Sequence, residues 1–233
     1  MTTALSASPT PTAPVLLGED ADSFLARMGL DAALLTRSLA EGITAAMNDY
    51  SPFAPATALG LTRWIKSVDS LRRALDTRGW TRLDPQNAPR SVSEDRTMAI
   101  ALMSGDAWTA QTTGSPTTVR PSGPVLQAEV ERNAARHSSA LPFQARFDLG
   151  ESAPLANAER ASEPQTWVLL SFWDEVHREL LAELSLPISI QDGRITRWAT
   201  RIILPTTSLA PELAKSLDGI PSESIDFPIE AVS

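Results

Sequence analysis

The sequence predicts an α+β fold in which an antiparallel β-sheet, ending in a C-terminal β-meander, packs against helices, with a further helical segment at the N-terminus. Two observations predict this fold. Apolar residues recur at helical spacing as far as Gly79, and the spacing then becomes that of extended chain. After Trp167, apolar and polar residues alternate along two long segments that meet near Gly193.

The composition limits what the protein can do. Of the 233 residues, 42% are hydrophobic and 21% are charged, which is enough apolar mass to bury a core. The chain has no cysteine, so disulfides, zinc–thiolate sites, iron–sulfur clusters and a cysteine nucleophile are excluded. No apolar run reaches the roughly 20 residues of a membrane-spanning helix, and no signal-peptide pattern is present. We therefore expect a cytoplasmic protein with no membrane contact.

Four regions follow one another along the chain. Residues 1–18 are rich in Thr, Ser, Pro and Ala, which predicts a disordered tail. Residues 19–56 are predicted to be an N-terminal helical segment, and residues 57–205 the α+β core domain. Residues 206–233 are a C-terminal extension, in which the alternation over 222–230 predicts a short edge strand that tolerates its proline.

Helical spacing predicts three helical regions. The N-terminal segment is expected to contain a short helix, a break near Gly29 and a longer helix from Asp31. The clearest helix covers residues 61–75 and should pack on the sheet with Trp64 buried. Its apolar stripe consists of Leu61, Trp64, Ile65, Val68, Leu71 and Leu75. A further helix begins at Pro124 and runs to about residue 137.

The remaining periodic segments are predicted strands. They cover residues 80–83, 97–103, 167–173, 176–190 and 195–204. The segment 167–173 is apolar on both faces and should be buried. Residues 174–184 also fit a helical period, so a helix remains the alternative there. The Ser/Thr/Gly/Pro-rich residues 105–123 predict a long loop, and residues 138–165 show no clean period.

The alternation around Gly193 predicts a register for the last two strands. A three-residue loop, 191–193, brings their apolar faces together. It pairs Ile190 with Arg194, Leu186 with Trp198, and Ala182 with Ile202. It also sets Glu183 opposite Arg201, whereas a two-residue loop would put Leu184 there. We therefore expect Arg197 and Arg201 to project together from the solvent face of the sheet.

No catalytic constellation can be assembled from these residues. The chain has no Gly-Lys of a phosphate-binding loop, no Gly-x-Ser-x-Gly turn and only two histidines. We predict no catalytic residue, no cofactor and no metal ligand, and expect that the protein is not an enzyme. The alternative is a magnesium site built from carboxylates alone, for which Asp84, Asp106 and Asp148 are the candidates.

Five residues are candidate binding residues: Asn87, Asp106, Arg194, Arg197 and Arg201. Asn87 lies between two prolines, and Asp106 directly follows a predicted strand. In both places a residue that bonds its own turn is the structural alternative. The three arginines lie on one predicted strand and form the best local basic patch. The tryptophans at 80 and 198 could stack on nucleic-acid bases. Both lie on the predicted apolar faces of strands, however, which favours packing in the core.

The charge distribution leaves two function classes open. The chain has a net charge of −8, whereas residues 58–147 carry twelve basic and eight acidic side chains. A non-catalytic accessory or interaction protein is favoured, because the acidic ends suit a protein partner. The alternative is a nucleic-acid-associated factor that uses the basic middle segment. The partner expected first is therefore a protein.

Several blocks of sequence resemble a known family. They are VDSLRRAL, GWTRLDPQNAP, SGDAWT, GPVLQAEVERN, AELSLPISIQDGRITRW and IDFPIE, within residues 57–230. Their order is similar to that in an uncharacterised bacterial protein family found on plasmids, phage-like elements and high-GC genomes. The resemblance implies an accessory protein of a mobile genetic element and no assigned activity. Relatives carry a more basic stretch before the central helix, where this chain has only Arg120.

Overall fold

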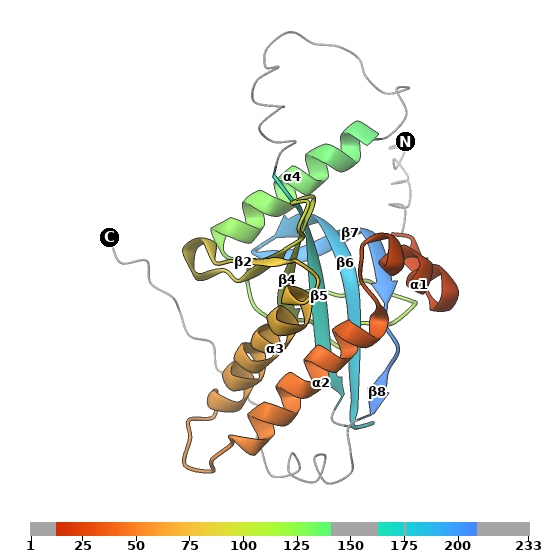
Figure 1. Ribbon diagram of the computed structural model, residues 1–233. Coiled ribbons are helices and arrows are strands. Elements are labelled where there is room, and N and C mark those ends of the chain that lie inside the picture. Colours follow the sequence, from red (N-terminus) through yellow and green to blue (C-terminus); the bar gives the residue numbers. More distant parts are fainter. Residues whose placement is uncertain (1–12, 141–162, 175, 209–233) are drawn as a thin grey trace, which may run out of the picture.

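The computed structural model describes residues 13–140, 163–174 and 176–208 (Figure 1). The helices of this part are α1 Gly18–Arg27, α2 Ala32–Asn48, α3 Ala58–Asp76 and α4 Pro124–Ala140. The strands are β1 Val15–Leu16, β2 Thr81–Leu83, β3 Arg90–Val92, β4 Met98–Ser104, β5 Gln165–Asp174, β6 Glu179–Gln191, β7 Arg194–Ile203 and β8 Thr207–Ser208. The predicted combination of helices and a sheet is confirmed. None of the described helices has the length and apolarity needed to cross a membrane.

The sheet is mixed, so the prediction of an antiparallel sheet is only partly right. The strand order is β1-β7-β6-β5-β4-β3-β2, and β8 pairs with β6. The pairs β4–β5 and β1–β7 are parallel, and the other pairs are antiparallel. The helix α4 lies between β4 and β5 in the chain. A helical crossover of this kind returns the next strand in the same direction, which a hairpin cannot do.

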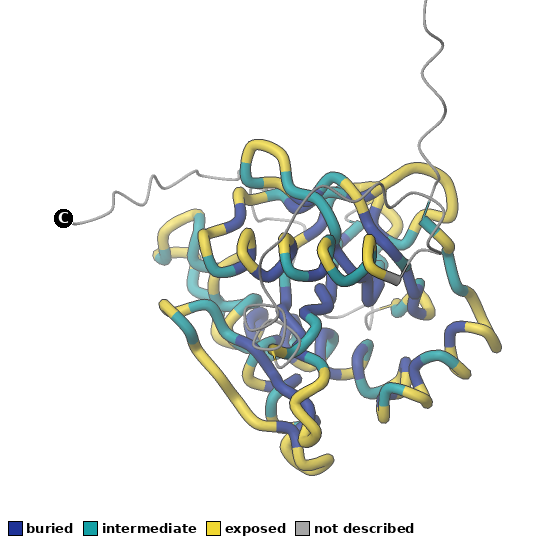
Figure 2. The backbone as a smooth tube through the Cα atoms, turned by 90° about the horizontal axis from the view of Figure 1, so that it is seen from above, coloured by how far each residue is buried: buried dark blue, intermediate teal, exposed yellow. Residues whose placement is uncertain are grey.

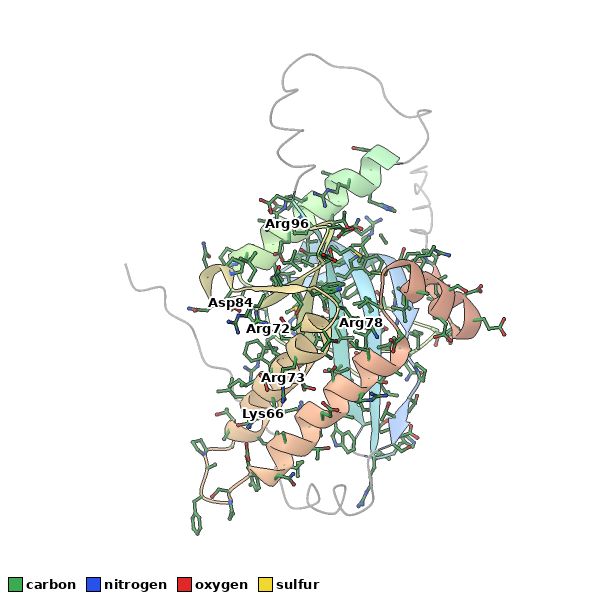
Figure 3. All side chains as sticks on the ribbon, in the orientation of Figure 1. Lys66, Arg72, Arg73, Arg78, Asp84 and Arg96 are labelled. Atoms are coloured by element: carbon green, nitrogen blue, oxygen red, sulfur yellow. The ribbon has the colours of Figure 1, made fainter. Side chains whose placement is uncertain are left out.

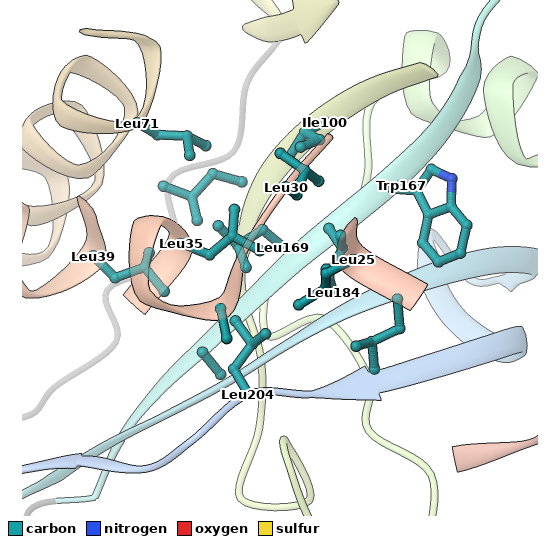
Figure 4. Packing of buried hydrophobic residues seen from close by; sticks show 14 of the residues in the cluster. Leu25, Leu30, Leu35, Leu39, Leu71, Ile100, Trp167, Leu169, Leu184 and Leu204 are labelled. Atoms are coloured by element: carbon teal, nitrogen blue, oxygen red, sulfur yellow. The ribbon is translucent and has the colours of Figure 1, made fainter. Parts of the chain in front are cut away.

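Helices cover both faces of the sheet (Figure 1). The alternation along β5 shows the two cores, because Trp167 and Leu169 face α1, α2 and α3, whereas Val168 and Leu170 face α4. Figure 4 shows the larger core, and in Figure 2 the buried positions lie inside, between the helices and the sheet. The prediction that β5 is buried on both faces is confirmed.

Polar contacts also hold α4 against the sheet. Arg90 of β3 and Glu129 of α4 form a buried ion pair with nitrogen–oxygen distances of 2.7 to 3.1 Å. The Asn133 side chain donates to the carbonyl oxygens of Thr166 at 2.8 Å and Pro187 at 3.1 Å. Because these groups are buried and paired, they fix where α4 sits along the sheet.

The N-terminal helices lie where the sequence predicts them. Gly29, at φ +69°, follows α1. The Asp31 carboxylate accepts the Leu34 backbone N–H at 2.6 Å and caps α2. Ahead of α1, however, Val15–Leu16 pairs with β7 as a parallel strand. The expected disordered tail over residues 1–18 is therefore wrong for these two residues, because backbone pairing holds a segment whose composition alone does not predict order.

The turn between β6 and β7 differs from the predicted one. It has two residues, Asp192 at φ +50° and Gly193 at φ +73°, and pairs Gln191 with Arg194. Two left-handed residues in sequence suit the twist of a tight hairpin, and Asp-Gly is a preferred sequence for it. The predicted three-residue loop and its pairings are therefore wrong.

Irregular pairing near Pro187 then shifts the register further along the hairpin. Beyond it, Leu184 lies opposite Ile202, and Ser185 opposite Arg201. Pro187 has no N–H to donate to the neighbouring strand, which favours a bulge there. The shift moves Trp198 to the face that α4 covers, away from the face of Leu186.

Residues 174 and 176–184 are not helical, so the helical alternative is wrong for the described part of this segment. The Asp174 carboxylate accepts the backbone N–H groups of Val176 and His177 and forms a turn. From Glu179 onward the chain is β6, whose even-numbered residues from Leu180 to Leu186 face the larger core as predicted. Pairing with strands on both sides stabilises the extended form over the helical one.

The helix α3 packs differently from the prediction. Its Ser67 lies against Gly42 of α2 so closely that a Cβ at position 42 would be 2.5 Å from the Ser67 backbone nitrogen. Trp64 is only partly buried, and its indole N–H donates to the Leu102 carbonyl oxygen at 3.1 Å. Because small residues bring the two helices together, α3 is turned and its Ile65 side chain stays 48% exposed.

Candidate functional site

The loop between β4 and α4, residues 105–123, is the most strongly anchored loop among the candidates from the sequence, and we call it the Trp108 loop. It contains no regular helix or strand, only one bridge between Gly105 and Thr118. Pro116 accepts a hydrogen bond from Trp198, which belongs to the core under α4. The loop therefore lies on the α4 face of the sheet. Ordered loops of this length with no regular structure are commonly functional.

A buried ion pair holds the middle of the Trp108 loop. The carboxylate of Glu183 and the guanidinium of Arg201 lie 2.6 Å apart at their nearest atoms, and their side chains are 0% and 2% exposed. Arg201 also donates to the carbonyl oxygens of Gln111 and Gly114, each at 3.0 Å. The Ala110 N–H donates to Glu183 at 2.8 Å. Each member of the pair thus binds the loop backbone directly.

The Glu183 carboxylate has a further donor beneath it. The Ser185 hydroxyl donates to its Oε1 atom at 2.7 Å, while Arg201 Nε donates to the same atom at 3.0 Å. A buried charge is tolerated only when it is paired and its lone pairs are satisfied. The two side chains interact as predicted. The expectation that Arg201 projects into solvent is wrong, because the Trp108 loop covers this face of the sheet.

The second half of the loop is bound by β7. Arg194 donates to the carbonyl oxygens of Thr118, at 2.8 Å, and Val119. The Thr117 hydroxyl donates to the Ile195 carbonyl oxygen at 2.8 Å. Trp198 donates its indole N–H to the Pro116 carbonyl oxygen at 2.9 Å. Two side chains of β7 therefore bind three carbonyl groups of the loop, and the Thr117 side chain binds the backbone of β7 in return.

Asp106 shapes the start of the loop. Its carboxylate accepts the Trp108 N–H at 3.1 Å, and its carbonyl oxygen accepts the Thr109 N–H at 2.9 Å. This is the turn-forming role that sequence analysis weighed against a binding role. Gly105 is required beside it, because a Cβ there would lie 2.1 Å from the Thr109 hydroxyl oxygen.

Trp108 is the large side chain that the loop leaves in solvent. It is 53% exposed, and its ring lies on Gly114, where a Cβ would approach a ring carbon to 2.6 Å. Gly114 has a φ of +85°, which favours glycine. The other exposed residues of this part of the loop are Ala107 and residues 111–115, and none of them is charged. The exposed residues around Trp108 are thus uncharged, and the exposed Arg120 belongs to the other end of the loop.

The structure brings three of the five predicted binding residues to this loop: Asp106, Arg194 and Arg201. Arg197 is exposed and binds none of the loop carbonyls that its two neighbours bind. Asn87, at φ +61°, lies instead beside a groove between α3 and β2. Trp108 is not among the residues predicted from the sequence, although a tryptophan inside a Ser/Thr/Gly-rich segment is a usable signal.

Four basic residues around α3 form ion pairs with neighbouring carboxylates, and all four are labelled in Figure 3. Their ion pairs are Lys66–Asp49, Arg72–Asp84, Arg73–Asp69 and Arg78–Asp31, with distances from 2.6 to 2.9 Å. The hydrogen bond from Arg78 is the main cause that lowers the pKa of Asp31. These four cations therefore add little net positive charge to this face.

The candidates for a carboxylate metal site are not gathered in one place. Asp84 is paired with Arg72, and Asp106 forms a turn with Trp108. Asp148 lies outside the described residues. Within the described ranges, no group of three His, Asp or Glu side chains is arranged to hold a metal ion. The tryptophans at 80 and 198 are buried in the two cores.

Comparison of the chain with protein-family models, with curated proteins and with solved structures finds no match. The resemblance over residues 57–230 to an uncharacterised bacterial family stays a prediction.

Proposed function

We propose that the protein is a non-catalytic interaction protein that binds a partner protein through the Trp108 loop. The observation that supports this most is the combination of a half-exposed tryptophan with a backbone fixed from below by Glu183 and Arg201. Tryptophan is among the residues most enriched in the energetic centres of protein interfaces. A rigid loop that carries one is suited to recognition.

Rigidity matters because binding orders the groups that make contact. A loop already fixed in one conformation loses little conformational entropy on binding, so more of the contact energy appears as affinity. Ala110, a non-glycine residue at φ +60°, is held in this conformation by its hydrogen bond to Glu183. Backbone strain of this kind persists only where the surroundings enforce it, and it is frequent at binding sites.

The surface around Trp108 favours a protein over a nucleic acid. Charged residues are depleted at the centre of protein interfaces, and binding loops combine aromatic anchors with small hydroxyl residues and glycine. The exposed stretch from Thr112 to Ser115 has this composition. A nucleic-acid site needs unpaired cations. Arg194 and Arg201 instead bind the loop backbone, and four cations around α3, Lys66, Arg72, Arg73 and Arg78, are ion-paired.

The experiment compares two exposed aromatic residues. The full chain is used to capture partners from a lysate of the native host, and each captured protein is then purified and titrated against three forms of the chain. These forms are the wild type, Trp108→Ala and the matched control Phe53→Ala, since Phe53 is also exposed but lies between α2 and α3. Duplex and single-stranded DNA are titrated in parallel.

We expect Trp108→Ala to weaken the partner's affinity by about 30-fold or more, the effect of a hot-spot residue, and Phe53→Ala to leave it unchanged. Thermal unfolding of both variants controls for damage to the fold. Equal affinities for wild type and Trp108→Ala would contradict the proposal. Binding of DNA that 0.2 M salt abolishes would favour the nucleic-acid alternative instead.

A further inference from the structure

A groove lies between α3 and the edge of the sheet, on the opposite side from the Trp108 loop. It encloses about 1020 Å³ and is lined on its apolar side by Trp64, Ile65, Val68, Leu75, Trp80 and Pro89. Ile65 and Leu61 are each about half exposed, although they belong to the apolar stripe of α3. The α2–α3 contact at Gly42 turns this stripe partly away from the sheet. The groove is therefore an apolar surface with room for further side chains.

The strand β2 forms one wall of the groove and is the last strand of the sheet. Its residues Thr81, Arg82 and Leu83 are all exposed, and in the described part of the chain β2 pairs only with β3. An edge strand presents backbone N–H and C=O groups on its outer side, which an extended segment can bind by adding one more strand.

The basic side chains along the groove differ in whether a carboxylate pairs with them. Arg72 and Arg73 are paired with Asp84 and Asp69, but Arg82 on β2 has no carboxylate within ion-pair distance in the described ranges. Arg82 pairs with Ser91, and Ser91 with Ile100 of the larger core, so the Arg82 side chain lies on the face of the sheet that lines the groove. Its aliphatic stem can pack there against an apolar side chain of a segment that lies beside β2.

The chain itself contains a segment with the matching pattern. Ile225, Phe227 and Ile229 alternate with Asp226 and Pro228, and Glu230 follows. In extended chain the three apolar side chains share one face. Proline is tolerated in such a strand when its nitrogen points away from the partner. These residues lie outside the described ranges, and sequence analysis predicts an edge strand for them.

The segment has enough chain to reach the groove. The last described residue is Ser208, and the sixteen residues 209–224 precede the segment. Fully extended, they span about 55 Å. Four strand spacings separate β6, with which β8 pairs, from β2, and they amount to about 19 Å. The register adds an offset of about 23 Å along the strands, from Trp173 to Thr166, so the direct separation is about 30 Å. A tether of this length holds the segment at an effective concentration in the millimolar range, so even a weak contact is populated.

We propose that residues 225–230 of this chain add to the outer edge of β2 and place Ile225, Phe227 and Ile229 in the groove. The segment then covers the exposed part of the α3 stripe. This contact is independent of the Trp108 loop, so each proposal can fail without the other.

Disulfide trapping in the full chain tests the contact, because the sequence has no cysteine of its own. The test pair is Thr81→Cys with Ser224→Cys, which joins exposed β2 to the residue before the segment. The matched control is Ala107→Cys with Ser224→Cys, since Ala107 is also exposed but lies in the Trp108 loop. A third variant adds Phe227→Ser to the test pair. Disulfide formation in a glutathione buffer is followed by mass spectrometry.

We expect the test pair to form its disulfide about tenfold faster than the control pair, through the higher effective concentration of the docked segment. Phe227→Ser should reduce this rate to that of the control. Equal rates for the two pairs, or no effect of Phe227→Ser, would overturn the proposal. A disulfide that joins two chains, with a rate that rises with protein concentration, would also overturn it, because the occupant would then be a second copy.

Discussion

Arg201→Ala should destabilise the protein strongly, in contrast to the small effect expected of an exposed cross-strand ion pair. The substitution removes the cation that faces the Glu183 carboxylate, whose side chain is fully buried. Breaking a buried pair by removing one partner costs about 3–5 kcal/mol, because the remaining charge stays buried and unpaired. The loop carbonyls of Gln111 and Gly114 lose their donor as well.

Urea unfolding of the full chain measures the loss of free energy of unfolding, and thermal unfolding measures the accompanying decrease in Tm. For a domain of this size, 1 kcal/mol corresponds to about 2–4 °C in Tm, so we expect a decrease of roughly 6–20 °C. The matched control is Arg197→Ala on the same strand, which should change stability by less than about 0.5 kcal/mol because Arg197 is exposed.

A double substitution separates the charge from the shape of the site. Glu183→Gln alone leaves the Arg201 cation buried without its carboxylate, and Glu183→Gln with Arg201→Met removes both charges. We expect the double variant to be less destabilised than the sum of Glu183→Gln and Arg201→Met, by more than about 1 kcal/mol of coupling. A loss below 1 kcal/mol for Arg201→Ala would refute the reasoning, since it would mean that the loop opens and water reaches Glu183.

Three further predictions concern other parts of the fold. Gly42→Ala should destabilise the protein by about 1–3 kcal/mol in urea unfolding, because the added Cβ meets the Ser67 backbone; an unchanged midpoint would mean that α2 and α3 move apart freely. Gly193→Val should lower Tm, because a β-branched residue is strained at a φ of +73°, whereas Gly193→Asn should be tolerated better. The hydrogen bond to Asp174 raises the pKa of His177 above its usual value near 6.5, so this pair stabilises the folded turn below that pH and the contribution disappears as pH rises through the raised pKa. Titration by NMR should show a lower His177 pKa in Asp174→Asn, and an unchanged value would contradict the pairing.

Local sequence was enough to predict much of the secondary structure. The helix cap at Asp31, the break near Gly29 and the helix that begins at Pro124 depend on residues within a few positions of each other. The even-numbered apolar residues of β6 and the two apolar faces of β5 likewise follow from a period of two. Such patterns report which face of an element is buried.

The tertiary structure decided which elements bury those faces. The direction of β5 beside β4 depends on the crossover through α4, and the register of β7 depends on Asp192, Gly193 and the irregular pairing at Pro187. Beyond Pro187 the observed register differs from the predicted one by two residues, which keeps the alternation of faces, so the hydrophobic pattern cannot distinguish the two there. Nearer the turn the difference is one residue, and Trp198 lies on the other face.

In the candidate site, too, the sequence predicted some of the residues and the tertiary structure decided how they act together. The sequence alone made Asp106, Arg194 and Arg201 candidate binding residues, because Asp106 directly follows a predicted strand and the arginines form a basic patch on one predicted strand. Their common role became visible only when the loop lay over β7 and Arg201 met Glu183 and the loop carbonyls. Exposure is a property of the packed chain, so the sequence determined that residue 108 is a tryptophan in a loop, and the fold decided that its ring faces solvent.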